Sequence, residues 1–320
     1  VHACGICGSD IACYLGRSHE GRYDLGPYVP GHEWCGEVVE VGSAVTTLRP
    51  GDKVVAESVI ACNHCLPCKE GMNNSYCQNW LHCGFEPDGY GAMAEYILGE
   101  EQFTYRVPDS MSYEEGALVE CCSIPYYAIW GRGGYVSMAD DVAVFGAGPI
   151  GMFAAAICRA AGARVTLIDP VTHRLELARE IIGVQAGIDP IHQNVKEEID
   201  RLTAGRGASL VLECSGSESG IAAAIDVAAI EGRVRFIGHS GNRMVGAKFE
   251  DTILKGLTLR GSAGSPHFFP ETIRFMSRVG ERIDVTKFIT HRFPLQQVQE
   301  AFRTAVEDRE RAIKVLLQMD

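Results

Sequence analysis

The chain alternates short apolar runs with helical patterns between residues 142 and 262, and this alternation constrains its fold most strongly. The candidate strands are 142–146, 164–169, 185–189, 209–216, 233–238 and 257–262. The stretches between them, such as 150–161, 172–182 and 219–229, are rich in Ala, Leu, Ile, Glu and Arg. Strands that alternate with helices in this way form a parallel sheet covered by helices. We therefore predict an α/β fold with a complete doubly wound sheet of six strands.

A glycine-rich turn follows the first of these strands and opens an Ala-rich helix. Gly146 permits a tight turn, Gly148 lets a pyrophosphate approach the backbone, and Gly151 allows close helix packing. Asp169 ends the second strand, where a carboxylate can accept hydrogen bonds from both ribose hydroxyls and repel a 2′-phosphate. The pattern predicts NAD rather than NADP, and the alternative is a Gly-rich turn with a capping Asp. The predicted cofactor-binding residues are Gly146, Gly148, Pro149, Ile150, Gly151, Asp169 and Arg174.

Four cysteines, Cys62, Cys65, Cys68 and Cys77, lie within 16 residues of one another. Four thiolates can close a tetrahedral zinc site and leave no open position, so the ion would organise a loop rather than react. A redox-active pair is the first alternative, but three evenly spaced cysteines and a fourth do not favour it. A zinc ribbon for nucleic acid would need two pairs farther apart in basic surroundings. We predict a structural zinc ion.

Composition excludes several classes of protein. An odd count of 13 cysteines in 320 residues does not suit a disulfide framework and indicates a reducing compartment, which we take to be the cytoplasm. With 41 acidic against 29 basic residues, the chain offers no basic stripe for nucleic acid or an anionic membrane. The longest apolar run, 142–158, is shorter than the roughly 20 residues of a spanning helix. The length exceeds what one hydrophobic core usually serves and predicts two domains.

The remaining segments have a different character. Residues 2–113 are rich in Gly, Pro, Cys and His, with short candidate strands at 37–42, 52–57 and 94–98. They predict an irregular, mostly antiparallel domain. The tail, 266–320, carries helix-like stretches at 270–278 and 295–306 and a final apolar run, IKVLLQ. That run predicts a terminal strand that returns to the first domain and makes it discontinuous.

Four further residues stand in short motifs and are ambiguous by spacing alone. Cys7 lies in GICGSD, His32 and Glu33 in PGHEW, and Glu120 in ALVECC. A lone Cys is usually a small buried hydrophobe, and a lone His is usually a satisfied core residue.

These motifs in combination resemble the zinc-dependent medium-chain dehydrogenases of the alcohol dehydrogenase superfamily. The resemblance runs the whole length and also rests on PGDKV (50–54), GYGAMAEY (89–96), VPD (107–109), GAGPIG (146–151) and ECSG (213–216). It is closest to the sorbitol (polyol) and threonine dehydrogenase-like branches, because EEGALVEC places Glu120 where alcohol dehydrogenases proper have a Cys. It implies a Rossmann domain, 122–263, inserted in a discontinuous GroES-like, mostly-β catalytic domain, 1–121 and 264–320, with the active site in the cleft between them.

The resemblance also implies a catalytic zinc ion, and so two zinc ions per chain. Its protein ligands would be Cys7, His32 and Glu120, with water or the substrate oxygen in the open position. Glu33 competes as a ligand that coordinates directly, hydrogen-bonds a zinc-bound water or exchanges with it. Ser9 occupies the position of a hydroxyl that hydrogen-bonds the substrate oxygen and starts proton relay. The reaction implied is reversible, NAD-linked oxidation of a secondary alcohol, namely a polyol, cyclitol or amino-alcohol, to a ketone.

Two other functions stay open. One is a threonine-type 3-dehydrogenase, and the other is a non-catalytic structural protein that binds NAD and zinc. Retention of Cys7, Ser9, His32 and Glu120 together argues against the second. Members of the family usually form homodimers or homotetramers, and we expect the same here. For the substrate, the candidate polar contacts are Tyr14, Arg17, Glu95 and Arg292.

The chain departs from the family pattern in three places. Ala12 stands where many members have a His that ends the proton relay, and His19 is a candidate substitute, although a surface histidine is the simpler interpretation of it. The last gap between the four cysteines is eight residues where seven is usual, which a loop tolerates. Roughly 35 to 40 residues that precede GICGSD in the family, and that would cover a sheet edge, are missing. We therefore expect a truncated N-terminus. Cys4, three residues before Cys7, is expected to pack in the core.

Overall fold

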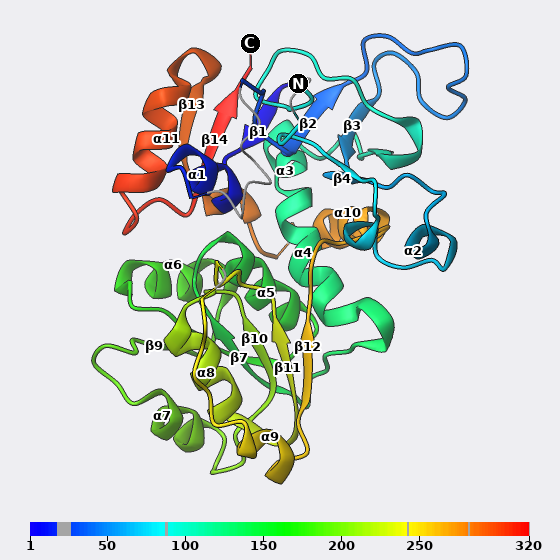
Figure 1. Cartoon of the computed structure of the whole chain (residues 1–320). Coiled ribbons are helices and arrows are strands. Elements are labelled where there is room, and N and C mark those ends of the chain that lie inside the picture. The colour runs from blue at the N-terminus through cyan, green and yellow to red at the C-terminus, as the bar shows by residue number, and fades with distance from the viewer. Residues whose placement is uncertain (18–26, 87–88, 242, 281, 320) are drawn as a thin grey trace. The chain divides into compact units, whose positions relative to one another are not determined.

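The computed structural model describes residues 1–17, 27–86, 89–241, 243–280 and 282–319. The chain divides into two compact units (Figure 1). The first comprises Val1–Ser123 and Gly264–Asp320, and the second comprises Ile124–Ala263.

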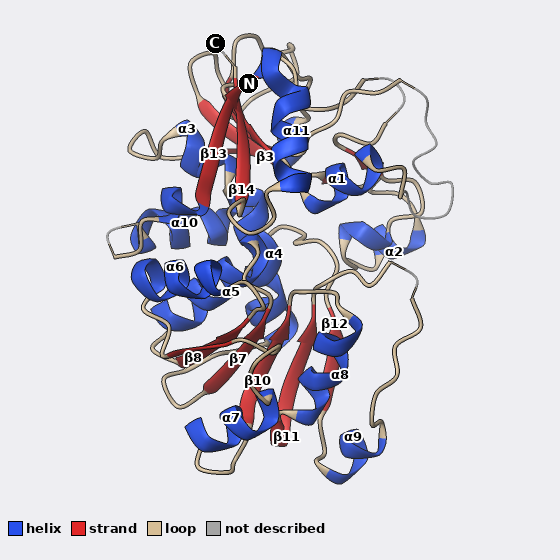
Figure 2. Ribbon diagram, turned by 90° about the vertical axis from the view of Figure 1, so that its left-hand side faces the viewer, coloured by secondary structure: helices blue, strands red, loops and turns tan. Residues whose placement is uncertain are grey.

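The second unit contains a six-stranded parallel sheet (Figure 2), and the predicted doubly wound sheet is confirmed. Its strand order is β12-β11-β10-β7-β8-β9. The chain therefore builds one half of the sheet outward from β7, returns, and builds the other half from β10. The strands are β7 (Asp141–Phe145), β8 (Arg164–Ile168), β9 (Ala186–Ile188), β10 (Ala208–Glu213), β11 (Ala228–Phe236) and β12 (Thr258–Gly261).

Helices cover this sheet as the sequence pattern predicts. One face, which includes Ala143 and Val211, packs against Ile199 of α7 and Ala224 of α8. The helix α5 buries every residue from Gly151 to Cys158, which explains its small and apolar composition. The helices are α5 (Pro149–Ala160), α6 (Thr172–Ile182), α7 (Val195–Leu202), α8 (Glu218–Asp226) and α9 (Glu250–Leu254). The strand β11 begins five residues before the start predicted for it, directly after α8.

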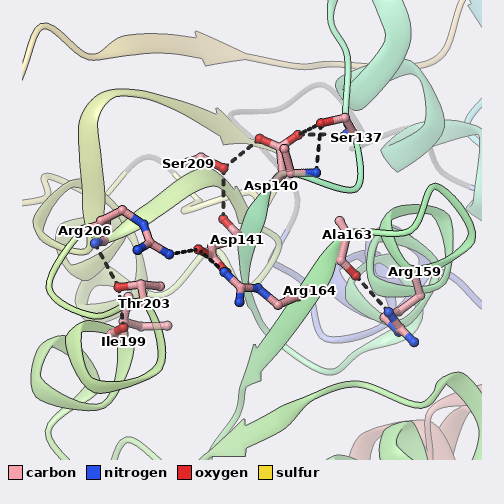
Figure 3. A network of polar contacts seen from close by, with 12 residues as sticks. Ser137, Asp140, Asp141, Arg159, Ala163, Arg164, Ile199, Thr203, Arg206 and Ser209 are labelled. Atoms are coloured by element: carbon pink, nitrogen blue, oxygen red, sulfur yellow. Dashed lines mark hydrogen bonds and ion pairs between the residues drawn. The ribbon is translucent and has the colours of Figure 1, made fainter.

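A polar network ties down the amino end of β7 (Figure 3). Asp140 accepts hydrogen bonds from Ser137 Oγ at 3.1 Å and from Ser209 Oγ at 2.6 Å. The neighbouring carboxylate of Asp141 pairs with Arg164 at 2.6 Å and with Arg206 at 3.4 Å. Both carboxylates are thus held by partners within this unit.

The first unit is built on a six-stranded sheet of order β13-β14-β1-β2-β3-β6. The C-terminal strand β14 pairs antiparallel with β1, and β1 pairs antiparallel with β2, so the predicted return of the tail to the first domain is confirmed. The strands are β1 (Ala3–Gly5), β2 (Glu33–Glu37), β3 (Lys53–Ala56), β6 (Thr104–Arg106), β13 (Ile289–Pro294) and β14 (Lys314–Gln318), and a separate pair is β4 (Val59–Ile60) with β5 (Leu81–His82).

The core of this unit lies between the sheet and its helices. Cys4 is fully buried there beside Trp34 and Leu317, which confirms that it packs in the core. The helices are α1 (Gly8–Tyr14), α2 (Leu66–Lys69), α3 (Tyr113–Ala117), α10 (Phe269–Val279) and α11 (Val298–Glu307), and α4 (Val119–Trp130) continues into the second unit. Of the helices in the described ranges, none has the length and apolar character needed to cross a membrane.

Two predicted strands of this unit are wrong. Residues 94–98 form no strand, and Tyr96 and Leu98 are 72% and 84% exposed. Ile97 is half-buried against the core of this unit, but no described strand pairs with the segment. The strand expected at 37–42 lies instead at Glu33–Glu37, where pairing with β1 buries Trp34 and Cys35.

Candidate functional site

Cys7, His32 and Glu33 form one cluster in the first unit. The antiparallel register of β1 and β2 sets Gly5 opposite Glu33, so Cys7, just after β1, and His32, just before β2, meet at the same end of the pair. One ligand atom from each of the three residues lies within 4.8 Å of the other two. His32 and Glu33 are buried and Cys7 is half-buried.

Asp10 lies behind His32. Its Oδ2 accepts a 2.8 Å hydrogen bond from the Cys7 backbone N–H, and its Oδ1 lies 3.8 Å from Nδ1 of His32. Nδ1 therefore faces Asp10, which leaves Nε2 for a metal, and such a carboxylate commonly orients a ligating imidazole. Burial by itself would lower the pKa of His32, but Asp10 and Cys7 outweigh it and hold that pKa well above its usual value. Asp10 stands within GICGSD, but its role was not predictable from the motif alone.

Lys314 pairs with Glu33. The ammonium group of this lysine contacts Glu33 Oε2 and donates a 3.1 Å hydrogen bond to the Ile6 carbonyl. Both side chains of the pair are 2% exposed, and the carboxylate raises the pKa of Lys314 although burial would lower it. Lys314 was not predicted as a site residue; its signal in the sequence was a lone charge inside the apolar run IKVLLQ. One carboxylate oxygen of Glu33 is therefore already paired with the ammonium group of Lys314.

Glu120 lies beside the cluster rather than within it. A capping box between Ser112 and Glu115 starts α3, and the chain then turns directly into α4, whose first turn carries Glu120. The carboxylate is buried and accepts a 3.2 Å hydrogen bond from Ser58 Oγ. Burial raises the pKa of Glu120 to about 7, although His32 opposes this. Within the described residues, Glu120 is not among the groups that meet within 4.8 Å.

The donor set at this site fits zinc. It offers a thiol, an imidazole and carboxylates, which are the usual protein ligands of that ion. The buried atoms His32 Nδ1 and Asp10 Oδ1 make no hydrogen bond in the described part of the chain, and a metal on Nε2 would draw Nδ1–H toward that carboxylate.

Aromatic side chains from the β5 region lie beside His32 of the cluster, and these residues were not predicted. The His82 ring lies 5.5 Å from the His32 ring and 4.6 Å from the Phe85 ring, measured between centroids. The Trp80 ring lies edge-on to His82, with the ring centroids 5.3 Å apart. The segment 80–85 carries no motif that would have predicted this position beside His32.

The other predicted catalytic and substrate-binding residues have varied positions. Ser9 is half-buried in the first turn of α1, two residues after Cys7, and Ala12 follows on the same helix. Tyr14 stacks on Phe302 with ring centroids 5.0 Å apart, and Arg292 forms a two-pronged pair with Glu114 at 2.7 and 2.8 Å. Arg17 and Glu95 are exposed, and the Glu95 carbonyl accepts a hydrogen bond from the amino group of Val1. His19 lies outside the described residues.

The four predicted structural ligands come together. The sulfur atoms of Cys62, Cys65, Cys68 and Cys77 all lie within 4.8 Å of one another. Cys65 Sγ lies 3.3 Å from Cys68 Sγ and 3.8 Å from Cys77 Sγ, close to the edge of a tetrahedron with Zn–S bonds of about 2.3 Å. The backbone N–H of Cys62 donates to Cys77 Sγ at 3.3 Å, and a backbone hydrogen bond from His64 lowers the pKa of Cys62 to about 6. These contacts favour a thiolate at Cys62, and the four clustered sulfur atoms fit zinc.

The glycine loop of the second unit joins β7 to α5. Asp169 Oδ2 accepts a 2.7 Å hydrogen bond from the Ala147 N–H, and its Oδ1 accepts one of 2.9 Å from Val171. Arg174 follows in the first turn of α6. No atom lies within 4 Å of the point where a Cβ of Gly148 would stand, so the loop has open space at Gly148 for a bound phosphate group. These residues fit a dinucleotide.

Glu213 organises the neighbouring loop and gives the ECSG motif its structural role. Its fully buried carboxylate accepts hydrogen bonds from the backbone N–H of Ser215 at 2.9 Å and of Gly216 at 3.1 Å. Gly216 and Gly238 are in close contact, so the loops after β10 and β11 meet beside the glycine loop after β7. Nucleotides bind at this edge of a doubly wound sheet.

Two glycines of the loop should respond differently to substitution. A Cβ at Gly151 would stand 1.8 Å from the Gly146 carbonyl oxygen, so Gly151→Ala forces the backbone to move and should cost about 1 to 3 kcal/mol of stability. We expect a lower thermal unfolding midpoint for this variant even without cofactor. Gly148→Ala is the matched control, because it has room for its methyl group; it should keep the midpoint but weaken dinucleotide binding measured by calorimetry. Equal midpoints for the two variants would contradict this account.

Comparisons with known proteins agree with this architecture. The alcohol dehydrogenase GroES-like domain family matches residues 1–109, and the zinc-binding dehydrogenase family matches residues 149–278. The chain is 31% identical over 318 residues to D-arabitol-phosphate dehydrogenase of Enterococcus avium, covering 98% of this chain and 87% of that protein. It is 33% identical over 305 residues to L-threonine 3-dehydrogenase of Bacillus licheniformis, covering 94% and 86%.

A solved structure shows the same fold. The crystal structure of 2R,3R-butanediol dehydrogenase from Bacillus subtilis matches with a TM-score of 0.86 and 29% sequence identity, covering 100% of this chain and 91% of that one. Together with the full-length similarity to curated enzymes, this establishes that the chain belongs to the zinc-dependent medium-chain dehydrogenases of the alcohol dehydrogenase superfamily.

Proposed function

We propose that this chain catalyses the reversible, NAD-linked oxidation of a secondary alcohol to a ketone, and that its substrate is a polyol, cyclitol or amino-alcohol. The observation that carries the proposal is the cluster of Cys7, His32 and Glu33, with Asp10 behind His32 and Glu120 beside it. The glycine loop and Asp169 supply a separate place for the dinucleotide. The relatives named above are polyol and threonine dehydrogenases.

The proposed ligands of the catalytic zinc are Cys7, His32 and Glu120, with Glu33 as the alternate. Lys314 supports this division because its ammonium group contacts Glu33, whereas Glu120 accepts its hydrogen bond from the neutral Ser58 hydroxyl. Zinc bound there would act as a Lewis acid and lower the pKa of the substrate hydroxyl. Asp10 keeps the His32 ring in one orientation, and Ser9 hydrogen-bonds the substrate hydroxyl and takes up its proton first. Cys62, Cys65, Cys68 and Cys77 hold the second, structural zinc ion.

NAD is the proposed cofactor in preference to NADP. Asp169 is buried, and its carboxylate is held by two backbone N–H groups, so it cannot swing away from an adenosine ribose. A fixed negative charge at that position repels a 2′-phosphate. Bound NAD would accept the hydride from the substrate carbon.

A cofactor-reduction screen tests the function. The purified enzyme is given sorbitol and other polyols, inositols, amino-cyclitols and L-threonine, each with NAD and with NADP. We expect turnover of a polyol, cyclitol or amino-alcohol, with kcat/KM for NAD at least about tenfold above that for NADP. Equal or better use of NADP would overturn the role of Asp169. Turnover of L-threonine and not of sorbitol would establish the threonine-type alternative, and a single zinc ion with no turnover would establish the structural one.

Two properties of the whole protein complete the proposal. We propose a homodimer or homotetramer, because β12 forms an edge of its sheet with Thr258 and Gly261 exposed, and an edge strand can pair with a second copy. The native mass in solution tests this. We also assign the enzyme to the cytoplasm, since its 13 cysteines, all of them free, suit a reducing compartment. Fractionation of cells tests that assignment.

A further inference from the structure

Three arginines share one face at the edge of the sheet in the second unit. Arg233 and Arg235 lie two residues apart on β11, and Arg260 on β12 pairs in register with Arg235. Residues two apart on a strand, and residues paired across parallel strands, point to the same face. Val234, between the first two, belongs to the core that packs against α7 and α8. The three arginine side chains therefore point to the opposite face.

Only the first of these charges is neutralised. Arg233 forms a 2.5 Å ion pair with Asp140 Oδ1, and its guanidinium lies 3.9 Å from the centre of the Tyr135 ring. Asp140 also accepts hydrogen bonds from Ser137 and Ser209 (Figure 3). This carboxylate is thus fully engaged and is not shared with the other two arginines.

Arg235 and Arg260 have no carboxylate partner among the residues that the structure describes. Arg260 donates a 2.7 Å hydrogen bond to the Gly131 carbonyl and lies 5.5 Å from the centre of the Tyr127 ring. Arg235 is 6% exposed, donates a single long hydrogen bond of 3.5 Å to the Val234 carbonyl, and leaves its Nε buried without a partner. Burial, with Arg260 and Arg233 nearby, lowers the pKa of Arg235.

This arrangement is unfavourable unless an anion completes it. Like charges directly opposite each other in a sheet are destabilising, and a buried charge without a counter-charge costs more than an exposed one. The chain as a whole carries a net charge of −12, so acidic residues are abundant. The absence of a carboxylate beside these two arginines, among the described residues, is therefore not a consequence of composition. The two uncompensated charges match a dianion, and guanidinium groups bind tetrahedral oxyanions through paired hydrogen bonds.

We propose that Arg235 and Arg260 form a binding site for a doubly charged tetrahedral oxyanion of the phosphate type. The site lies on β11 and β12, whereas the glycine loop follows β7. The proposal uses none of the residues assigned to the dinucleotide and does not depend on the proposed reaction.

Calorimetric titration with inorganic phosphate tests the site on the intact, purified protein at constant ionic strength. We expect saturable binding of one phosphate per chain. Arg235→Met and Arg260→Gln should each weaken that binding at least about tenfold, because each removes a charged hydrogen-bond donor. Arg179→Gln is the matched control, since this exposed arginine lies on α6 of the same unit, and it should bind phosphate as the wild type does.

Thermal unfolding separates binding from folding. In buffer without phosphate, Arg235→Met should unfold at the same midpoint as wild type or higher, because it removes an unpaired buried charge and keeps most of the side-chain volume. Phosphate at tenfold its dissociation constant should raise the wild-type midpoint by about 2 to 4 °C and leave both variants unmoved. Absence of saturable binding to wild type, or equal affinity in wild type and both variants, overturns the proposal. The second result would place the phosphate elsewhere, for example at the amino end of α5.

Discussion

Cys7→Ser is expected to remove one of two zinc ions per chain and to lower turnover by at least about 10³-fold. A serine hydroxyl is a poor zinc ligand at neutral pH, and His32 and a carboxylate by themselves hold the ion weakly. Zinc content by elemental analysis and kcat with the substrate found in the screen measure the two effects. The unfolding midpoint should change little by comparison, because Cys7 is half-buried and lies outside the fully buried core.

Cys13→Ser is the matched control for this prediction. Cys13 is a half-buried cysteine on α1, the same helix that Cys7 precedes, and it does not belong to the metal cluster. This variant should keep both zinc ions and wild-type turnover. A Cys7→Ser protein that retained two zinc ions and full activity would remove the Cys7, His32 and Glu33 region from consideration as the catalytic centre.

Cys77→Ser is expected to release the other zinc ion and to lower the thermal unfolding midpoint by about 10 °C or more. Structural zinc contributes about 10 to 16 kcal/mol in isolated zinc-binding peptides, so losing even part of this has a large effect. Loss of this zinc ion should also disturb hydrogen bonds outside the four cysteines. Asn74, three residues before Cys77, donates a 3.0 Å hydrogen bond to the buried carboxylate of Glu57, which also accepts one from the His267 N–H at 3.0 Å.

Chelation and alkylation check this second prediction independently. A chelator should lower the midpoint of wild type toward that of Cys77→Ser and should leave the variant itself unmoved. Alkylation of the native, metal-loaded protein should spare Cys62, Cys65, Cys68 and Cys77, and chelation should expose them. Ready alkylation of these four thiols in the metal-loaded protein would contradict a closed thiolate site.

The sheet of the second unit and the glycine loop between β7 and α5 were predictable because the sequence patterns that indicate them are local. Strand and helix periods can be read over a few residues, and the loop from Gly146 to Gly151 has the turn chemistry that β7 and α5 require. The predicted helices 150–161 and 172–182 agree with α5 and α6 to within one residue at each end. The four cysteines were equally readable, since their ligand spacing is contained in one short segment.

The irregular first unit was less predictable because its elements depend on distant partners. Residues 94–98 have the composition of a strand, yet no neighbouring strand buries them. The segment 33–37 became a strand because β1 lies beside it, and β1 in turn is flanked by the far C-terminal end of the chain. Pairing of this kind leaves no local trace in the sequence.

The sequence by itself determined the fold class, the dinucleotide loop, the four-cysteine site and the residue types of a zinc centre. Only the tertiary structure decided how charge is distributed around that centre. Lys314 contacts Glu33 from a position 281 residues away, and Asp10 in the first turn of α1 lies beside His32, which directly precedes β2. The physical reason is that spacing along a chain governs which atoms meet within a turn or a helix. Electrostatic partners in a buried site are chosen by strand register, which brings β14, β1 and β2 side by side.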